Sequence, residues 1–454
     1  MGKLFGTDGV RGEANTELTP ELAFRLGRVG AYMLTKQVKA APRVLVAKDS
    51  RRSGDMLEAA LAAGLCSIGA VVYQAGVIPT PAVAYLVQKY NLDAGVMITA
   101  SHNTMNDNGI KFFNNKGFKL PDAVEDEIEK LVSQLQMGND NLPRPIGEGV
   151  GVMQPCDTGL DDYISYLLST VPGLDLTGIK VALDCANGAT SEAASIVFEK
   201  LNATVHTLHN TPDGTNINAN CGSTHMESLQ EYMKAQGADI GLAFDGDGDR
   251  VLALCEKGEL LDGDKILALC GSDMKERGKL EKNTIVATVM SNQGLELYCN
   301  KKGLILHRTD VGDRYVLEKM LADNLTLGGE QSGHVIFLSY GTTGNGILTG
   351  LQMLSIMARK KKSISALTSE MEILPQVLVN VKVPNHRKAE LATCENIQKA
   401  QSEIESAMNG EGRILVRPSG TEPVVRVMLE GRDLDKITNW ANNLKKVIEK
   451  NLES

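Results

Sequence analysis

Short apolar runs rich in β-branched residues alternate with longer helical stretches along most of this chain. The strand candidates are residues 43–48, 94–99, 179–184, 239–244, 284–289 and 304–307. The helix candidates are residues 20–36, 55–68, 122–136, 189–201, 225–236, 290–301, 346–360 and 433–450. This alternation is typical of α/β folds, in which helices cover a sheet.

A faint internal repeat adds to this pattern. Residues 93–99 and 239–245 both read Asp-x-Gly followed by apolar residues, and both lead into a polar loop. Residues 43–54 and 179–190 are also alike, and residues 284–334 repeat the order more weakly. Chance similarity between buried strands is the alternative explanation. If the repeat is real, three related α/β units each present a polar loop at a strand's carboxyl end, where open α/β sheets bind ligands.

Length and charge narrow the classes of protein. At about 150 residues per domain, 454 residues suggest about three domains. The formal net charge of −9 argues against nucleic acid as a partner. We expect no membrane segment, because no apolar run approaches about 20 residues, and the amino terminus lacks a signal-peptide core. The eight cysteines show no CxxC spacing, which favours reduced thiols and a cytoplasmic location over disulfides or a zinc site.

The densest acidic motif is Asp245-Gly246-Asp247-Gly248-Asp249-Arg250. Carboxylates at alternate positions can turn their oxygens onto one hard cation. An EF-hand would also place Glu256 as its last ligand, but Arg250 stands where its turn glycine is required and the flanks are strand-like. A surface acidic loop without metal is the other alternative. We expect a Mg²⁺ site that leaves coordination positions open for phosphate oxygens.

A second polar loop follows the predicted strand at 94–99 and contains Ser101-His102. A serine directly after a buried strand is a reachable nucleophile. Taken alone, the pair would more often cap a loop than catalyse a reaction. The acidic motif changes that balance, because a phosphate on Ser101 would be a natural fourth ligand of the three-aspartate cation.

Two further loops carry polar side chains. Residues 329–334 read Gly-Glu-Gln-Ser-Gly-His, a set suited to sugar hydroxyls, in which His334 is either a general acid or base or a structural histidine. Residues 417–423 read Arg-Pro-Ser-Gly-Thr-Glu-Pro, with Arg426 following. Arginine with short donors in a tight turn suits a phosphate, although an ordinary turn is the alternative. After about residue 370 the runs VLVNVKV and VVRVML predict a separate α+β domain.

Taken together, the motifs resemble those of the α-D-phosphohexomutase family. FGTDGVRG, TASHN, FDGDGDR, VGDRYV, GGEQSGH and RPSGTEP occur in the family's order, from residue 5 to the 420s. The resemblance implies three similar mixed-sheet α/β domains and a C-terminal α+β domain around a central cleft. We expect the domains at residues 1–153, 154–255, 256–370 and 371–454.

The resemblance also implies roles for individual residues. Ser101 would be the phosphoserine, and Asp245, Asp247 and Asp249 would bind Mg²⁺ together with its phosphate. The other catalytic residues would be Lys111 and His334 for acid–base work and Arg11 and Arg250 beside the transferring phosphate. The sugar contacts would be Glu330 and Ser332. The residues binding the unreactive phosphate would be Arg417, Ser419, Gly420, Thr421 and Arg426.

Within the family, the motifs GGEQSGH and VGDRYVLEKM are typical of the bacterial branch that acts on glucosamine phosphates. The implied reaction interconverts glucosamine 6-phosphate and glucosamine 1-phosphate through glucosamine 1,6-bisphosphate, and would feed UDP-N-acetylglucosamine and cell-wall precursor synthesis. Asn345 replaces an aspartate frequent in this branch, and Thr104-Met105 stands where many members have proline.

Several alternatives stay open at this stage. A related mutase would use glucose or mannose phosphates. A phosphatase would use Asp245 as an aspartyl-phosphate nucleophile, and a structural protein would use the acidic loop for calcium. The oligomeric state is also open, and a homodimer is one arrangement that the sequence allows.

Overall fold

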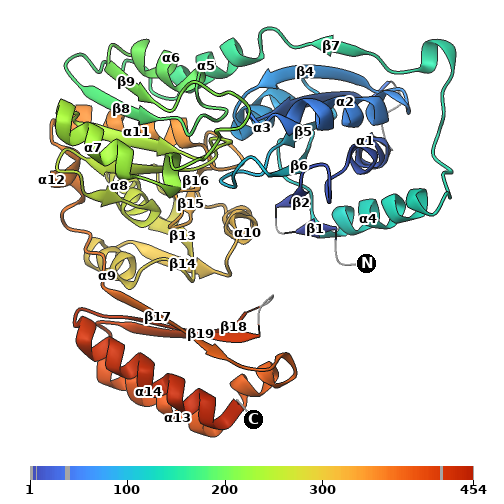
Figure 1. Ribbon diagram of the computed structural model, residues 1–454. Coiled ribbons are helices and arrows are strands. Elements are labelled where there is room, and N and C mark those ends of the chain that lie inside the picture. The colour runs from blue at the N-terminus through green and yellow to red at the C-terminus, as the bar shows by residue number, and fades with distance from the viewer. Residues whose placement is uncertain (1–3, 7, 36–40, 420–422, 453–454) are drawn as a thin grey trace. The chain divides into compact units, whose positions relative to one another are not determined.

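Four β-sheets organise the chain, and they are shown in the computed structural model in Figure 1. The structure describes residues 4–6, 8–35, 41–419 and 423–452. The chain divides into two compact units. The larger unit comprises residues 1–289 and 307–368, and the smaller comprises residues 290–306 and 369–454.

The same order of four strands occurs in three sheets. In the first sheet it is β6 (Asp107–Asn114), β5 (Ala94–Ile98), β3 (Arg43–Lys48) and β4 (Val71–Val77). In the second it is β11 (Val251–Cys255), β10 (Ile240–Phe244), β8 (Lys180–Asp184) and β9 (Thr204–Leu208). In the third it is β16 (Val335–Phe337), β15 (Leu327–Gly329), β13 (Thr284–Thr288) and β14 (Ile305–Thr309). The repeat predicted from the sequence is therefore confirmed.

Strand directions repeat as well. In every set the second strand runs antiparallel to the first and parallel to the third. The loops that follow β5, β10 and β15 therefore leave equivalent points of three related sheets. These are the loops that carry Ser101, the three aspartates and the Glu330–His334 segment.

Short strands extend two of these sheets, and helices cover them. The additional strands are β1 (Phe5–Gly6), β2 (Gly9–Glu13) and β7 (Met153–Pro155) in the first sheet and β12 (Leu260–Leu261) in the second. The helices up to residue 236 are α1 (Pro20–Thr35), α2 (Ser53–Cys66), α3 (Thr80–Lys89), α4 (Asp122–Gln136), α5 (Gly159–Ser169), α6 (Ala193–Glu199) and α7 (Glu227–Gln236). The remaining helices of the larger unit are α8 (Gly263–Glu276), α10 (Asp313–Asp323), α11 (Gly346–Lys360) and α12 (Ile364–Thr368).

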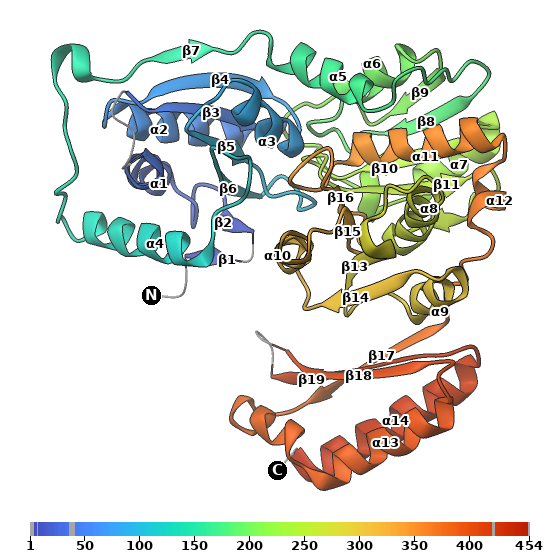
Figure 2. The same cartoon turned by 180° about the vertical axis from the view of Figure 1, so that it is seen from behind.

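The first sheet shows why these sequences form buried strands. All five residues of β5 are buried, as are all five of β10. Val44 and Val96 share one core with apolar residues of α1, α2 and α4, whereas Val83 and Val87 of α3 lie against the sheet at Gly95. Helices thus pack on both faces (Figure 2), which is why the strand sequences are almost continuously apolar.

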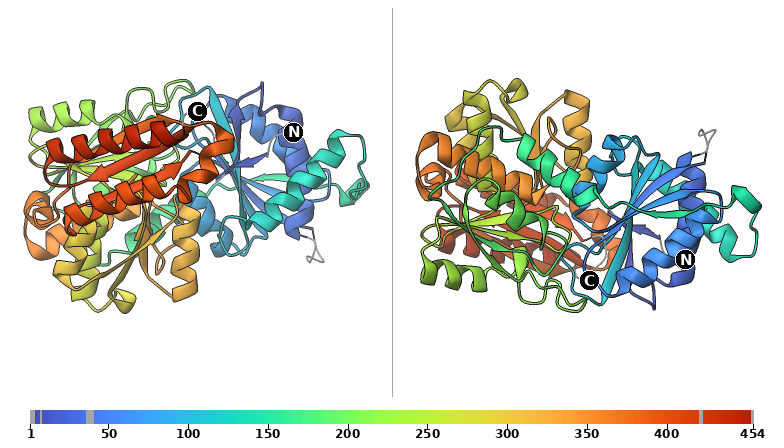
Figure 3. Two further views of the ribbon diagram at one scale, coloured as in Figure 1. Left: turned by 90° about the horizontal axis from the view of Figure 1, so that it is seen from below. Right: turned by 90° about the horizontal axis from the view of Figure 1, so that it is seen from above.

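The smaller unit is built differently. Its antiparallel sheet has the order β17 (Gln376–Lys382), β19 (Val424–Glu430) and β18 (Arg413–Pro418). Figure 3 shows α13 (Glu395–Met408) and α14 (Leu434–Leu452) side by side on this sheet, and α9 (Gln293–Lys302) also belongs to the unit. The three α/β sheets and this terminal α+β sheet confirm the predicted fold class.

The structure also bears on the predicted state of the cysteines and on the predicted absence of a membrane segment. All eight cysteines, each of them a described residue, are free thiols. Among the described residues, no helix is both long and apolar enough to cross a membrane.

Candidate active site

Ser101 lies in a buried and strained loop at the end of β5. Its backbone φ is 53°, in the left-handed region that residues other than glycine seldom adopt. The side chain is 1% exposed, and the backbone N–H donates to Thr99 Oγ1 at 2.9 Å. Such backbone strain persists only where the surrounding structure imposes it, so contacts from other segments must hold this loop in place.

Arg51 supplies most of those contacts. Its side chain is fully buried and forms an ion pair with Asp49, with 2.9 Å between Nε and Oδ2. Nη2 donates to the carbonyl oxygens of Ser101 at 3.1 Å and Asn103 at 2.7 Å, and Nη1 donates to the carbonyl oxygens of Thr104 and Asp107. A planar guanidinium is suited to this role because its five N–H groups point in fixed directions.

Asn218, from the second sheet's loops, binds the same two carbonyls. Its Nδ2 lies 2.8 Å from the oxygen of Ser101 and 2.8 Å from that of Asn103. The nucleophile loop is therefore fixed to the loop system that carries the aspartates.

The acidic loop needs glycine at two positions, for a different structural reason at each. A Cβ on Gly246 would lie 2.6 Å from the Ser101 carbonyl oxygen, so this position must lack a side chain for the two loops to meet. Gly248 has φ of 71°, which favours glycine and turns the chain between Asp247 and Asp249. The alternation of Asp and Gly thus serves both close packing and the turn.

Ser101 and Asp245 are in direct contact. Ser101 Oγ donates to Asp245 Oδ2 at 2.7 Å, whereas His102 Nδ1 is 3.5 Å from the same hydroxyl. That nitrogen lies 3.2 Å from Arg250 Nη1, and because a guanidinium can only donate, it accepts that bond. Burial and the Arg250 charge also lower the pKa of His102, so the ring is neutral and Asp245 is the group bound by the serine hydroxyl.

Three buried carboxylates converge in this loop and could hold a metal ion. Asp245, Asp247 and Asp249 each present an oxygen within 4.8 Å of the others, and none is more than 3% exposed. Among the described residues, Asp247 Oδ1 and Asp249 Oδ1 have no hydrogen-bond partner. Buried carboxylate oxygens without partners are costly unless a cation binds them, so this donor set fits a hard divalent ion.

The carboxyl groups differ in their titration. Burial, with help from Asp249 and Asp247, raises the pKa of Asp245 well above its ordinary value. Burial acts in the same direction on Asp249, but the charge that His334 carries when its ring is protonated, together with the charge of Lys111, outweighs it and lowers that pKa. Burial and the different charged neighbours of the two carboxyl groups therefore separate the pKa values of two otherwise similar groups.

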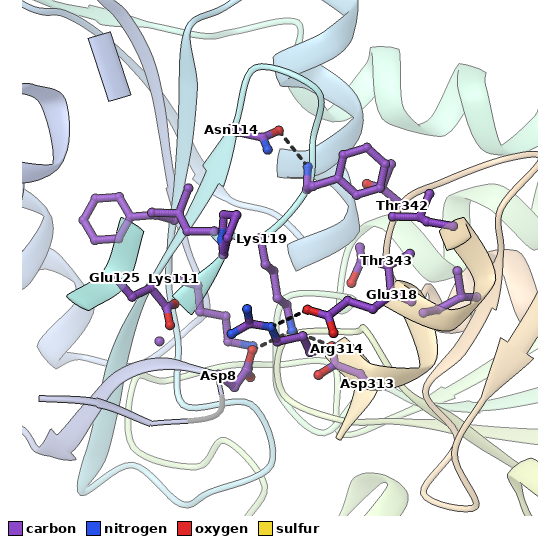
Figure 4. A pocket seen from close by; sticks show the side chains of 18 residues that line it. Asp8, Lys111, Asn114, Lys119, Glu125, Asp313, Arg314, Glu318, Thr342 and Thr343 are labelled. Atoms are coloured by element: carbon purple, nitrogen blue, oxygen red, sulfur yellow. Dashed lines mark hydrogen bonds and ion pairs between the residues drawn. The ribbon is translucent and has the colours of Figure 1, made fainter. Parts of the chain in front are cut away.

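A ring of acidic and basic side chains adjoins the cluster and includes Asp249, and part of it lines the pocket of about 210 Å³ shown in Figure 4. Lys111 Nζ lies 2.9 Å from Asp8 Oδ2, and Lys119 Nζ lies 2.6 Å from both Asp8 Oδ1 and Asp313 Oδ2. The ring continues through His334, whose Nε2 is 3.4 Å from Asp313 and whose Nδ1 is 3.5 Å from Asp249. Asp249 closes it at 3.9 Å from Lys111 Nζ.

Lys111 is held in its charged form by this arrangement. Its Nζ is 3.0 Å from Asp247 Oδ2, and the residue is 2% exposed. Burial acts to lower the pKa of Lys111, but the charges of Asp247, Asp8 and Asp249 outweigh it and raise the pKa. A lysine general base needs a lowered pKa, and a cation bound to the aspartates would offset the charges that raise it.

His334 shows a conflict between hydrogen bonding and charge. The backbone N–H of Gly344 donates to Nε2 at 2.9 Å, which requires that nitrogen to be unprotonated. Burial acts to lower the pKa of His334, yet Asp249 and Asp313 outweigh it and raise the pKa. Because two N–H groups cannot face each other at 2.9 Å, the ring is neutral in this arrangement, with its proton on Nδ1.

Both predicted arginines lie at this site. Arg250 donates its backbone N–H to Asp245 Oδ1 at 3.1 Å, and its guanidinium Nε is 3.9 Å from Asp249. Arg11, in β2, forms an ion pair of 2.5 Å with Asp8, and its Nε has no hydrogen-bond partner among the described residues. Each guanidinium therefore adjoins the acidic cluster or its ring.

The residues of the loop after β15 differ in their contacts with the acidic cluster. Glu330 accepts a hydrogen bond from the Gly312 N–H at 3.2 Å, and its charge contributes to raising the pKa of Arg250, although burial of the guanidinium opposes that rise. Ser332 is exposed, and no contact between described residues joins it to the acidic cluster. Asn345 caps α11 by accepting from the Leu348 N–H at 3.0 Å, a role that asparagine and aspartate perform about equally.

The predicted phosphate-binding residues of the C-terminal loop are only partly described. Gly420 and Thr421 lie outside the described residues. Arg417 and Arg426 are directly opposite on β18 and β19, and Lys388 Nζ donates to the Ser419 carbonyl at 2.6 Å. Like charges directly opposite on a sheet are unfavourable, so this pair is suited to an anion.

Four residues of the larger unit were missed by sequence reasoning. Asp8 and Asp313 lie inside the motifs FGTDGVRG and VGDRYV, so those motifs could have indicated them. Lys119 and Arg51 stand in ordinary polar stretches and become recognisable only through their contacts.

Models of the phosphoglucomutase/phosphomannomutase family match this chain in all four parts: α/β/α domain I at residues 2–138, domain II at 161–258, domain III at 262–373 and the C-terminal domain at 378–447. The chain belongs to the α-D-phosphohexomutase family. The four matches agree with the predicted resemblance, while the predicted boundaries at residues 153, 255 and 370 stay predictions.

Individual relatives are similar over the full length of this phosphohexomutase. Phosphoglucosamine mutase of Ruminiclostridium cellulolyticum is 55% identical, with 99% of each chain covered. A crystal structure of a phosphoglucomutase/phosphomannomutase family protein from Burkholderia thailandensis is similar with a TM-score of 0.81 and 25% identity, covering 99% of this chain and 97% of that one. Aspergillus fumigatus N-acetylphosphoglucosamine mutase, solved with GlcNAc-6P and magnesium, has a TM-score of 0.70 and 18% identity, covering 98% and 95%.

The contacts of Arg51 generate a prediction. Arg51→Lys removes most of the N–H donors that hold the Ser101 loop. It also weakens the ion pair with Asp49, because an ammonium group cannot reproduce the geometry of the guanidinium. We expect turnover of the phosphosugar to fall by about 10- to 100-fold through misplacement of the nucleophile, and the free energy of unfolding to fall by about 3 kcal/mol.

Steady-state kinetics and chemical denaturation at one temperature measure the two effects. The matched control is Arg52→Lys, the same change at the exposed neighbouring arginine, which should leave both quantities near wild type. Wild-type turnover in Arg51→Lys would contradict the positioning role.

Proposed function

We propose that this chain is a phosphoglucosamine mutase that interconverts glucosamine 6-phosphate and glucosamine 1-phosphate. The observation that carries the proposal is the 2.7 Å contact between Ser101 Oγ and Asp245 within the three-aspartate cluster. It joins a nucleophile to a candidate metal site in a chain of this family. The full-length similarity to a phosphoglucosamine mutase supports the choice of sugar.

We propose that Asp245, Asp247 and Asp249 hold Mg²⁺ together with a phosphate on Ser101. The partnerless oxygens of Asp247 and Asp249 support this, because they are hard ligands directed into a buried site. A bound Mg²⁺ would neutralise charge on the phosphoryl group.

The proposed reaction balances as two transfers. Phospho-Ser101 donates its phosphoryl group to a sugar hydroxyl: the bond from phosphorus to Oγ breaks, a bond to the sugar oxygen forms, and the hydroxyl proton passes to a base. The resulting 1,6-bisphosphate reorients, and Ser101 Oγ attacks the other phosphoryl group: a bond from phosphorus to Oγ forms, the bond from phosphorus to the sugar oxygen breaks, and the Oγ proton passes through an acid–base group to that sugar oxygen. Arg11 and Arg250 would supply positive charge beside the group in transfer.

Other residues would bind the sugar and move protons. His334 and Lys111 are the proposed acid–base pair, and the neutral ring of His334 next to Asp249 supports its part. Glu330 and Ser332 are proposed to contact sugar hydroxyls. The residues proposed to bind the unreactive phosphate are Arg417, Ser419, Gly420, Thr421 and Arg426.

We further propose that the enzyme works in the cytoplasm, which the eight free thiols support, and that its product feeds UDP-N-acetylglucosamine and cell-wall precursor synthesis. We also propose, from the sequence alone, that the enzyme can form a homodimer.

Ser101→Ala tests the phosphoserine mechanism. Turnover of glucosamine 6-phosphate with added glucosamine 1,6-bisphosphate should fall by about a thousandfold or more, because Ser101 supplies the hydroxyl that donates to Asp245 and no other one does so among the described residues. Stopped-time product assays at saturating Mg²⁺ measure it. Ser195→Ala, whose hydroxyl donates to the Glu192 carbonyl at 3.3 Å on α6, is the control and should retain wild-type turnover.

Full turnover by Ser101→Ala would contradict the mechanism. The alternative with Asp245 as nucleophile predicts an acid-labile acyl phosphate on the trapped enzyme, whereas a phosphoserine survives mild acid.

Parallel kinetics on three sugars test the choice of substrate. We expect kcat/KM for glucosamine 6-phosphate to exceed that for glucose 6-phosphate and mannose 6-phosphate by at least about tenfold, because polar groups placed for an amine lose a partner when a hydroxyl replaces it. Equal or inverted kcat/KM values would instead identify a phosphoglucomutase or phosphomannomutase.

A further inference from the structure

A second cluster of metal-ligating side chains lies outside the site described above. Asp184 at the end of β8, His209 just after β9 and Cys221 in the following loop each present one ligand atom within 4.8 Å of the others. Asp184 and Cys221 are fully buried, and His209 is half-buried. The proposed mutase reaction uses none of the three.

The internal repeat provides a comparison for Asp184. Asp49 is its counterpart in the first sheet: Asp49 directly follows β3, and Asp184 is the last residue of β8, the same strand of the repeat. Both accept, through Oδ1, the backbone N–H two residues ahead, at 3.0 Å from Arg51 and 2.9 Å from Ala186. The second oxygen of Asp49 is neutralised by the Arg51 guanidinium and bonded by Thr99 Oγ1.

No arginine is available to Asp184 at the equivalent point, because residue 186 is alanine. Its Oδ2 has no hydrogen-bond partner among the described residues and lies 3.0 Å from His209 Nδ1, which also lacks one. The two atoms are at ion-pair distance, and Asp184 raises the pKa of His209, although the angle between them is not that of a well-formed hydrogen bond. Ligands about 2.0–2.2 Å from one cation lie about 3 Å or slightly more from each other, so this spacing also fits two ligands of one ion.

Two backbone features hold this arrangement. His209 has φ of 48°, a left-handed conformation in which a non-glycine residue is uncommon. Its carbonyl oxygen accepts the Asn187 N–H at 2.6 Å. The ring is therefore directed at Asp184 by a constrained backbone, which is the kind of outer support that orients metal ligands.

We propose that Asp184, His209 and Cys221 form a binding site for a thiophilic divalent transition metal, with Zn²⁺ as the best fit. A carboxylate, an imidazole and a thiolate together suit Zn²⁺, which binds mixed O, N and S donors, whereas Mg²⁺ prefers oxygen alone. The chain would thus carry two cation sites of different chemistry. Binding would require loss of the Cys221 thiol proton, which passes to solvent.

A metal ion could reach this site from solvent, and its binding would affect the loops that hold the nucleophile loop. The half-buried His209 gives an ion access from solvent, and three protein ligands leave a fourth position for water. Cys221 lies three residues after Asn218, which binds the carbonyls of Ser101 and Asn103. An ion here would stabilise the loops against which the nucleophile loop is fixed.

No local sequence pattern indicates this site. Cysteine spacing favoured reduced thiols over a zinc site, since CxxC pairs were absent. The three ligands come from three loops, so only folding joins them.

Cobalt titration tests the proposal. The full-length enzyme is freed of metal with a chelator, supplied with excess Mg²⁺ to occupy the three-aspartate site, and titrated with Co²⁺. We expect one equivalent to bind with a thiolate-to-cobalt charge-transfer band, which an all-oxygen site cannot produce, and Zn²⁺ but not further Mg²⁺ to displace it. Cys221→Ser should abolish the band, while Cys185→Ser, at the buried neighbour of Asp184, should retain it.

Thermal unfolding gives a second readout in the same buffer. Zn²⁺ should raise the Tm of the wild type saturably, and this rise should disappear in His209→Gln, with circular dichroism used to establish that each variant is folded. A wild type that binds no Co²⁺ with a thiolate band would overturn the proposal and leave His209 and Asp184 as a simple ion pair. A band that persists in Cys221→Ser, or Co²⁺ that Mg²⁺ displaces, would equally overturn it.

Discussion

The concentration of negative charge around three buried aspartates is the constraint on which this structure depends. Two like charges about 4 Å apart repel by about 4 kcal/mol at the effective dielectric of a protein surface, and more when water is excluded. The positive charges of Lys111, Lys119 and Arg250 partly compensate this repulsion, since these residues lie in or beside the ring of acidic and basic side chains. That compensation is incomplete, since carboxylate oxygens of Asp247 and Asp249 stay without hydrogen-bond partners. A cation and a phosphoryl group are what such a site can accept together.

A repeated sheet order brings these charges to one place. The loops after β5, β10 and β15 leave equivalent strands of three related sheets, and each contributes one chemical element: a serine, a carboxylate cluster and a histidine. The repeat also shows divergence. At the end of the neighbouring strand, Asp49 is paired with an arginine and fixes the nucleophile loop, whereas Asp184 faces a histidine and a cysteine. Equivalent positions of two similar sheets thus have two different environments.

Sequence reasoning found what is local and missed what folding assembles. Continuous apolar runs predicted β5 and β10, because strands buried on both faces are apolar throughout. Helix α3 was missed because seven of its ten residues are buried, so its helical period is weak. Ser101 and the aspartates stand in short motifs that could be recognised from composition and spacing. The cation of Lys119 and the five donors of Arg51 act on residues distant in sequence, so no local pattern could reveal them.

The central claim is that Ser101 is the residue that carries the phosphoryl group. Intact mass of the purified enzyme before and after incubation with glucosamine 1,6-bisphosphate, followed by fragmentation of the peptide that contains residue 101, tests it most directly. The account predicts one added phosphoryl group, located on Ser101 and removed when glucosamine 6-phosphate is supplied in excess. A catalytically active enzyme that never carries phosphate on Ser101, or carries it on Asp245, would contradict the account.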